Sequence, residues 1–287
     1  MSLAYASSQT RLVAGSSLRR GSYSAAWFAA MGLGAVCAWL FLPSSVVAAY
    51  ALPALVVFIA AIVSSIAGFA FSALAGAFLF HMTHDALEAL QIMLIASLAI
   101  QVCCTWQVRQ QISPRSLMPY LAGGFAAIPL GLYFLQTIPL SLHISALGIF
   151  LVLYGTYMLV RPSCLMKSNS LVGQIIVGAL GGVTGALAAF PSAFLTMWCA
   201  CQGWSKEQQR AINQPYILVM QIAVFTALTT IRPLQTIRPE LLLYMLPALI
   251  GAWIGLRIYG RLNTRQFNKL VCPLLVVAGA LLAAKGL

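Results

Sequence analysis

The distribution of apolar residues along the chain predicts a protein built from membrane-spanning helices. Nine long apolar runs alternate with short polar segments. Most runs hold about 19–21 residues, the length of helix that crosses the hydrocarbon core of a bilayer. The runs cover residues 24–42, 53–80, 86–106, 117–135, 142–160, 171–200, 211–230, 240–258 and 268–284.

Two of these runs, 53–80 and 171–200, are too long for one straight helix across the membrane. Small residues and helix breakers interrupt both. The first contains SSIAGFAFSALAG from Ser64 onward, and the second contains GALGGVTGALAAFPSAF from Gly178 onward. Glycine near the middle of each run, and proline in the second, predict a broken helix or a re-entrant hairpin.

The positions of the basic residues favour long runs that enter and leave the membrane on one side. If every run crossed once, Lys and Arg would fall on both faces with little bias. If the two long runs return to their side of entry, 13 of the 16 basic residues share one face. By the positive-inside bias this face is cytoplasmic, with the N-terminus inside and the C-terminus outside. The 13 are Arg11, Arg19, Arg20, Arg109, Arg115, Arg161, Lys167, Lys206, Arg210, Arg257, Arg261, Arg265 and Lys269.

The chain also contains a weak internal repeat. Upstream, Gly68 matches Gly185 at a shift of 117 residues. Further along, the segment that begins at Pro114 resembles the one that begins at Pro239. A shift of 124 residues there matches Tyr120 with Tyr244, Gly131 with Gly255, and Gly155 with Gly279.

The repeat predicts an all-α polytopic membrane protein with two halves, 53–160 and 171–285. Each half would be one broken run followed by three transmembrane helices, and an odd number of crossings per half inverts the second copy. Paired broken helices in inverted repeats are typical of secondary transporters, which bind substrate at the breaks near the midplane. A cytoplasmic tail, 1–23, and an extra N-terminal helix, 24–42, would precede the halves. A cleaved signal is the alternative for 24–42, although no clean small-x-small cleavage site follows it.

Composition excludes the other broad classes. Hydrophobic residues make up 61% of the 287 residues, charged residues only 7%, and the net charge is +12. Soluble domains carry roughly a quarter charged residues, so soluble, disordered and fibrous classes are excluded. Because the basic residues flank apolar runs, they indicate contact with anionic lipid and not with nucleic acid.

No constellation of an enzyme is present. The chain has three histidines and four acids, without a paired carboxylate, a metalloprotease motif or a phosphate-binding loop. The cluster HMTHD, from His81 to Asp85, is read as an interfacial loop, with a weak metal or proton role as the alternative. Glu88 is read as an exposed helix start, with proton coupling as the alternative. We therefore expect no resident metal and no cofactor.

The two breaks are the candidate substrate site. A broken helix frees N–H and C=O groups that must face protein or a wet cavity, and the start of its second half presents donors and positive partial charge that suit an anion. These donors are expected near residues 69–72 and 186–190, with serine and threonine hydroxyls beside them. For the glycines, close helix packing is the alternative role.

Amides within the spans add candidates. Gln91 and Asn213 fall at similar places in the two halves, and each needs a partner, which is either a neighbouring helix or a cavity. No Lys or Arg lies clearly at mid-membrane, so neutral donors and helix ends would hold the anion. The predicted substrate-binding residues are Ser65, Gly68, Phe69, Ala70, Phe71, Ser72, Gln91, Thr184, Gly185, Ala186, Ala189, Ser192 and Asn213.

Taken together, these motifs resemble the sulfite exporter (TauE/SafE-type) permeases. In the first half the likeness lies in the glycine-interrupted run, in PRSLMPYLAGGFAAIPLGLYFL and in GIFLVLYGTYMLVRP. In the second half it lies in LVGQIIVGALGGVTGALAAFPSAFLTMW and GWSKEQQRAINQ. The resemblance covers about 50–285. The first break departs from the family's pattern, because FAFSALAG stands where further glycines and a proline are usual.

The resemblance implies an integral membrane permease for small sulfur-containing anions such as sulfite, thiosulfate or organosulfonates, in a bacterial inner membrane. The family's glycine-rich breaks would fall at Gly68, Gly181, Gly182 and Gly185. We expect transport by alternating access, with a small anion and the lipid bilayer as partners. The oligomeric state is left open, and a homo-oligomer is one alternative. The alternatives are a membrane scaffold or assembly subunit, and a thiol-dependent redox protein that uses Cys103, Cys104, Cys199 or Cys201.

Overall fold

The computed structural model describes residues 44–68, 71–82, 86–160, 170–231 and 239–259, with seven further positions between 273 and 284. Within these ranges every regular element is a helix. Several predictions fall outside the described residues: the tail 1–23, the helix 24–42, Phe69 with Ala70, and most of the run 268–284.

The helices follow the predicted apolar runs closely. Five of the described helices are long and apolar enough to cross a membrane, which confirms the all-α polytopic membrane class. The elements are α3 Ser44–Ala67, α4 Phe71–Met82, α5 Ala86–Val108, η1 Arg109–Gln111, α6 Pro114–Thr137, α7 Leu140–Val160, α8 Leu171–Ala188, α9 Ala193–Cys201, α10 Lys206–Ile231, η3 Pro239–Tyr244 and α11 Met245–Tyr259.

Both long runs are broken, as predicted. The first divides into α3 and α4, and the second into α8 and α9. A residue with left-handed backbone ends the first half-helix in each case: Gly68 with φ of 85° and Ala189 with φ of 52°. Such a residue cannot continue a right-handed helix, and its N–H bonds back to the last turn. The N–H of Ala189 donates in this way to the carbonyl oxygen of Gly185, over 2.9 Å.

The position predicted for the second break is wrong by four residues. Gly185 lies inside α8, and the chain leaves the helix only at Ala189. The structural counterpart of Gly68 is therefore Ala189, 121 residues further on, and not Gly185. Gly185 lets α8 lie close to the turn that follows it, since a Cβ there would lie 3.1 Å from that of Pro191.

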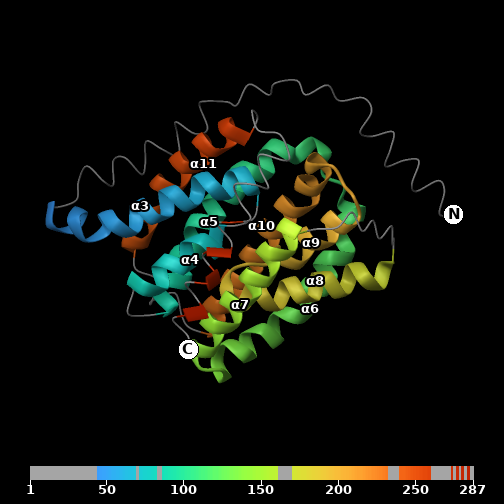
Figure 1. Ribbon diagram of the computed structural model, residues 1–287, viewed down its shortest axis with the longest axis horizontal. Coiled ribbons are helices and arrows are strands. Elements are labelled where there is room, and N and C mark those ends of the chain that lie inside the picture. The colour runs from blue at the N-terminus through green and yellow to red at the C-terminus, as the bar shows by residue number, and fades with distance from the viewer. Residues whose placement is uncertain are drawn as a thin grey trace.

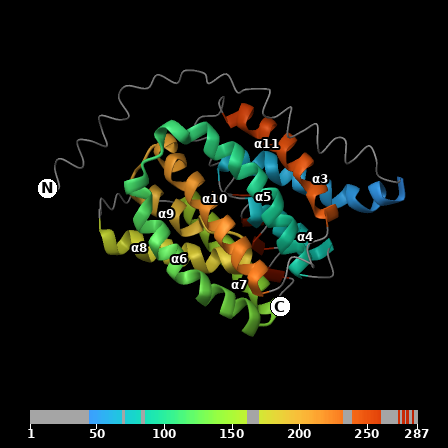
Figure 2. The same cartoon turned by 180° about the vertical axis from the view of Figure 1, so that it is seen from behind.

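The two halves of the chain exchange helices. α3 of the first half packs along α11 of the second, and α6 of the first packs along α8 of the second. Figures 1 and 2 show these two pairs on opposite sides of the molecule, with α5 and α10 between them. This crossed pairing agrees with a repeat, because equivalent helices make equivalent contacts. The inverted orientation of the halves stays a prediction.

Close backbone approach holds both exchanged pairs together. A Cβ on Gly178 of α8 would collide with the carbonyl oxygen of Tyr120 in α6. In the other pair, a Cβ on Gly255 of α11 would collide with the carbonyl oxygen of Ile62 and would lie 2.9 Å from the Cβ of Ser65. Small residues let helices pack this tightly in lipid, where no hydrophobic force drives them together.

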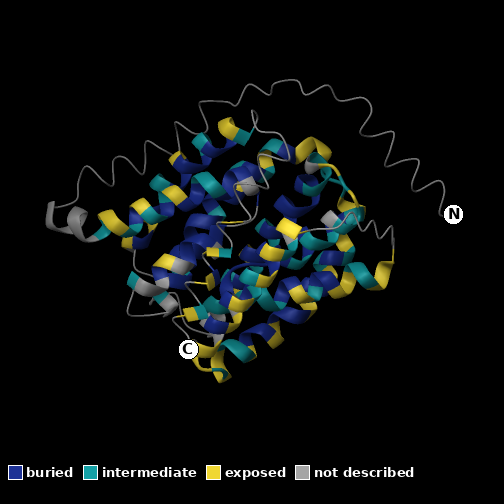
Figure 3. Ribbon diagram, in the orientation of Figure 1, coloured by how far each residue is buried: buried dark blue, intermediate teal, exposed yellow. Residues whose placement is uncertain are grey.

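Large apolar side chains cover the outside. Figure 3 shows buried residues at the helix contacts and exposed ones on outward faces. Leu130 and Tyr133 of α6 and Ile176 of α8 are all at least half exposed. An apolar surface of this kind would drive a soluble protein to aggregate, whereas lipid tails solvate it.

Gly178→Ala is expected to destabilise the protein, because its methyl group overlaps the α6 backbone. Overpacking of this kind costs about 1–3 kcal/mol or more, and should lower the midpoint of thermal unfolding in detergent by several degrees. Val172→Ile adds a similar group to an exposed position of the same helix and should leave the midpoint almost unchanged. Equal behaviour of the two variants would contradict the close approach.

Candidate functional site

The fold brings the two breaks into contact. Ser72, at the start of α4, donates a hydrogen bond from Oγ to the carbonyl oxygen of Ala189, over 2.6 Å. Phe71 beside it and Ser192 at the start of α9 are both buried. Residues 117 positions apart in the chain thus satisfy a polar group that the break in α8 leaves open. This is the internal satisfaction that a break within lipid requires.

Two side chains of α10 satisfy the end of α3. Arg210 donates from Nη2 to the carbonyl oxygens of Ser65 and Ile66, the latter over 3.1 Å. Gln214, one turn further on, donates from Nε2 to the carbonyl oxygen of Gly68 over 2.8 Å. Because the C-terminal end of a helix carries negative partial charge, a guanidinium is well suited to this position.

The guanidinium of Arg210 also stacks on an aromatic ring. Its Cζ lies 3.5 Å from the ring centroid of Tyr259, at the end of α11. A cation over the face of a tyrosine is attracted by the ring's electron density. Arg210 therefore joins three helices: α10, which carries it, α3, whose end it caps, and α11.

Arg210 corrects two expectations. The apolar run was expected to begin only after it, and no positive charge was expected at the breaks. Instead α10 begins at Lys206, and Arg210 is buried with 7% of its surface exposed. A positive charge thus lies at the first break, where only neutral groups were expected. The spacing of Arg210 and Gln214 by four residues, on one face of a helix, was the available signal.

Some of the other predicted residues lie at the breaks, and others do not. Asn213 belongs with the breaks, because its Nδ2 donates to Thr196 Oγ1 of α9 over 3.0 Å. Thr184 and Ala186 do not, because α9 begins only at Ala193 and both lie within α8. The donors expected at 186–190 are therefore misplaced. Gln91 lies near the start of α5 and is partly exposed.

Within α8, Thr184 bonds its own helix, with Oγ1 donating to the carbonyl oxygen of Leu180 over 3.0 Å. Ala186 is fully buried in the contact with α6, because a Cβ built on Gly131 of α6 would lie 2.7 Å from the Cβ of Ala186. Both residues therefore serve the structure of α8 and its packing, and the polar groups at the second break come from other residues.

Several buried polar atoms around the breaks have no hydrogen-bond partner. They include Ser64 Oγ, Ser192 Oγ, Asn213 Oδ1 and Gln214 Oε1. Such atoms are rare in native proteins, because leaving one unsatisfied costs about 1–3 kcal/mol. Ser192 directly precedes α9, where a serine normally caps the helix with its side chain, yet this hydroxyl does not. These polar groups lie on elements that meet at the breaks, where a polar ligand or water would be accepted.

Within the described ranges, the thiols and the acids do not form a metal-binding site. No group of three His, Cys, Asp or Glu side chains there is arranged to hold a metal ion. Cys104 and Cys199 are buried, and the hydroxyl of Tyr157 shares a hydrogen bond with Cys201 Sγ over 3.0 Å. Most of the HMTHD cluster falls outside the described residues.

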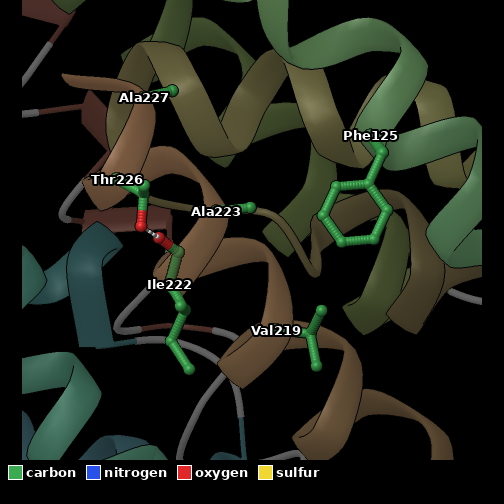
Figure 4. Close-up of a pocket in the computed structure, with 6 residues that line it drawn as sticks. All are labelled: Phe125, Val219, Ile222, Ala223, Thr226 and Ala227. Carbon is green, nitrogen blue, oxygen red and sulfur yellow. Dashed lines mark hydrogen bonds between the residues drawn. The ribbon is translucent and has the colours of Figure 1, made fainter. Parts of the chain in front are cut away.

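An apolar pocket of about 420 Å³ lies elsewhere, between α6 and α10. Figure 4 shows Phe125 of α6 facing Val219, Ile222 and Ala223 of α10, while the hydroxyl of Thr226 turns back to its own helix. Phe125 and Ile222 are about half exposed, so the pocket opens on the outer surface of the helices. Its lining suits a lipid chain and offers nothing to an anion.

Apolar spanning helices, with two breaks that bring buried polar groups together, define a multi-pass membrane protein of the transporter type. Residues 52–282 match the family described as "Sulfite exporter TauE/SafE". The match covers well over half of the chain, so this protein belongs to the TauE/SafE family and is a membrane transporter. The comparisons with curated proteins and with solved structures found no match.

Gly68→Ala should damage the protein more than Gly185→Ala. Alanine at residue 68 must adopt a left-handed backbone, at a cost of about 1–2 kcal/mol, and its methyl would press on Gln214 Nε2 at 3.1 Å and Arg210 Nε at 3.3 Å. Residue 185 has one contact of this kind, with Pro191 Cβ at 3.1 Å, but it is helical, where alanine is intrinsically favoured over glycine. The midpoints of thermal unfolding of the two variants in detergent test this. A larger loss of the unfolding midpoint for Gly185→Ala would contradict the position of the second break at Ala189.

Proposed function

We propose that this protein carries a small sulfur-containing oxyanion across the cell membrane by alternating access between its two halves. The substrate would be sulfite, thiosulfate or an organosulfonate. The observation that carries the proposal is the contact between the breaks, where Ser72 meets Ala189, beside the end of α3 that Arg210 caps. Family membership supports the chemical class of the substrate.

The groups at the breaks are suited to an oxyanion. α4 and α9 both begin there, at Phe71 and Ala193, and the first N–H groups of a helix point outward with positive partial charge. Hydroxyls at Ser64 and Ser192 are buried without partners and can donate to oxygen atoms. Arg210 adds a full positive charge. Tetrahedral or pyramidal oxyanions have several acceptor atoms, so they can bind donors that lie on separate helices.

The exchange of helices supports a rocking movement. α3 contacts α4 and α11 on one side, and α8 contacts α6 and α9 on the other. The two groups meet at the breaks through a hydrogen bond between Ser72 and Ala189, which a small rotation would break. Opposite orientation of the two halves would let the same movement open the site first to one side and then to the other.

The charge bias continues to support a cytoplasmic N-terminus in the inner membrane. In the proposed topology 13 of the 16 basic residues share one face. Glu88 lies in the first turn of α5 and is partly exposed. That position would let it exchange protons with water if transport is proton-coupled.

Purified protein in liposomes should move labelled sulfite, thiosulfate or ethanesulfonate faster than protein-free liposomes. A carrier must also exchange anions, so unlabelled anion inside the vesicles should accelerate uptake of label from outside. Chloride and acetate inside the vesicles serve as non-sulfur controls. The absence of flux for every sulfur anion would contradict the proposed substrate class. Flux without acceleration by internal anion would contradict alternating access.

A further inference from the structure

The apolar pocket between α6 and α10 has room for a chain-like ligand. Its volume of about 420 Å³ lies within the usual range of ligand pockets, about 300–1,000 Å³. Phe125 of α6 forms one wall, and residues of α10 between Val219 and Ala227 form the other (Figure 4). Thr226 is the one polar residue of this lining, and its hydroxyl donates to the carbonyl oxygen of Ile222 over 2.9 Å. The pocket therefore presents apolar groups to an occupant.

An exposed stripe along α6 leads from this pocket to a positive charge. Its four members are spaced by three, four and three residues, which places them on one face of the helix. They are Arg115, Met118, Ala122 and Phe125, and all four are exposed. The ten residues from the first member to the last correspond to about 15 Å along the helix axis. The stripe is thus an apolar surface with a cation at one end and the pocket at the other.

The cationic end of the stripe belongs to a basic segment. Arg109 in η1 and Arg115 at the second position of α6 are both exposed. The sequence contains no acid between Glu88 and Glu207. The guanidinium of Arg109 stacks on Trp106, with 4.4 Å between its Cζ and the ring centroid. Tryptophan and arginine at the end of an apolar helix are typical of the level of the lipid headgroups, so a phosphate is expected beside this segment.

A lipid matches these features better than a second copy of the chain. The hydrocarbon of one leaflet is about 15 Å deep, so an acyl chain whose headgroup lies at Arg115 extends to the level of Phe125. A transmembrane helix is about 10–12 Å across, and it would lie over the mouth of the pocket without filling it. The positive charge at one end of the stripe favours a lipid with net negative charge.

We propose that the stripe and the pocket bind an anionic phospholipid such as phosphatidylglycerol. Arg115 pairs with the phosphate, and one acyl chain lies along Met118 and Ala122. The end of that chain enters the pocket between Phe125 and α10, where each buried methylene group contributes to binding. The lipid then joins α6 of the first half to α10 of the second. This site is separate from the breaks, so the inference goes beyond the proposed function and does not depend on it.

Lipid binding to the purified, delipidated protein tests the site without a measurement of transport. Native mass spectrometry compares the affinities for dioleoylphosphatidylglycerol, dioleoylphosphatidylcholine and dihexanoylphosphatidylglycerol. The long anionic lipid should bind about fivefold more tightly than the zwitterionic one, as expected for one basic residue at the headgroup. The short anionic lipid should bind at least about tenfold more weakly than the long one, because its chains end before the pocket. Equal affinity within either pair overturns the inference.

Two arginine variants test the contact with the headgroup. Arg115→Gln should abolish the preference for dioleoylphosphatidylglycerol over dioleoylphosphatidylcholine. Arg257→Gln is the matched control, because it removes an exposed arginine from the last turn of α11 and should keep the fivefold preference. An equal loss in both variants would mean that the overall surface charge attracts the lipid, which contradicts a site at Arg115.

Alanine variants test the pocket. Ala223→Leu places a larger side chain in the pocket and should weaken binding of dioleoylphosphatidylglycerol at least about tenfold, with little effect on the dihexanoyl lipid. Ala126→Leu, at an exposed position of α6 outside the lining, should leave both affinities unchanged. If Ala223→Leu does not fold, Ala227→Leu fills the same pocket and decides.

The same variants separate the lipid from a second copy of the chain. Unchanged affinity of a folded pocket variant for dioleoylphosphatidylglycerol overturns the inference. If that variant instead converts a dimer into a monomer in size-exclusion chromatography while lipid affinity stays the same, a second copy occupies the pocket and the assignment to a lipid is wrong.

Discussion

The need to satisfy backbone groups at two interrupted helices organises this protein. Inside a bilayer, a carbonyl or N–H released by a broken helix has no water to bind. Here each break is satisfied by the opposite half of the chain. Arg210 and Gln214 of the second half cap α3, and Ser72 of the first half bonds the end of α8. The breaks therefore join the two halves, at the place that we propose for the substrate.

The two breaks are equivalent in backbone but not in charge. Gly68 and Ala189 share left-handed geometry, yet a guanidinium and an amide serve the first and a serine hydroxyl serves the second. Ala189 carries a methyl group in a conformation that favours glycine, which costs about 1–2 kcal/mol and is retained only because the surroundings impose it. The two breaks thus have similar backbone geometry, but the one buried charge of the described residues lies at the first break.

The sequence predicted the helices and the existence of both breaks well, because apolar length and glycine content are local properties. It misplaced the second break, because Gly185 lies inside α8, where it faces Pro191, and the left-handed residue is Ala189. It also missed Arg210, because a basic residue at the edge of an apolar run is normally a topology signal. Which carbonyl a guanidinium meets depends on residues some 145 positions away, and no local pattern contains that information.

The crossed pairing of helices bears on how the chain is assembled. α3 is among the earliest described helices to be synthesised, but its principal partner, α11, ends at Tyr259. Almost the whole sequence must be inserted before the glycines of α11 can meet the α3 backbone. Contacts of such long sequence separation form slowly, because the intervening chain must be ordered first. Until α10 is inserted, the end of α3 lacks the guanidinium of Arg210, so an incomplete nascent chain offers membrane chaperones and proteases an exposed polar helix end to recognise.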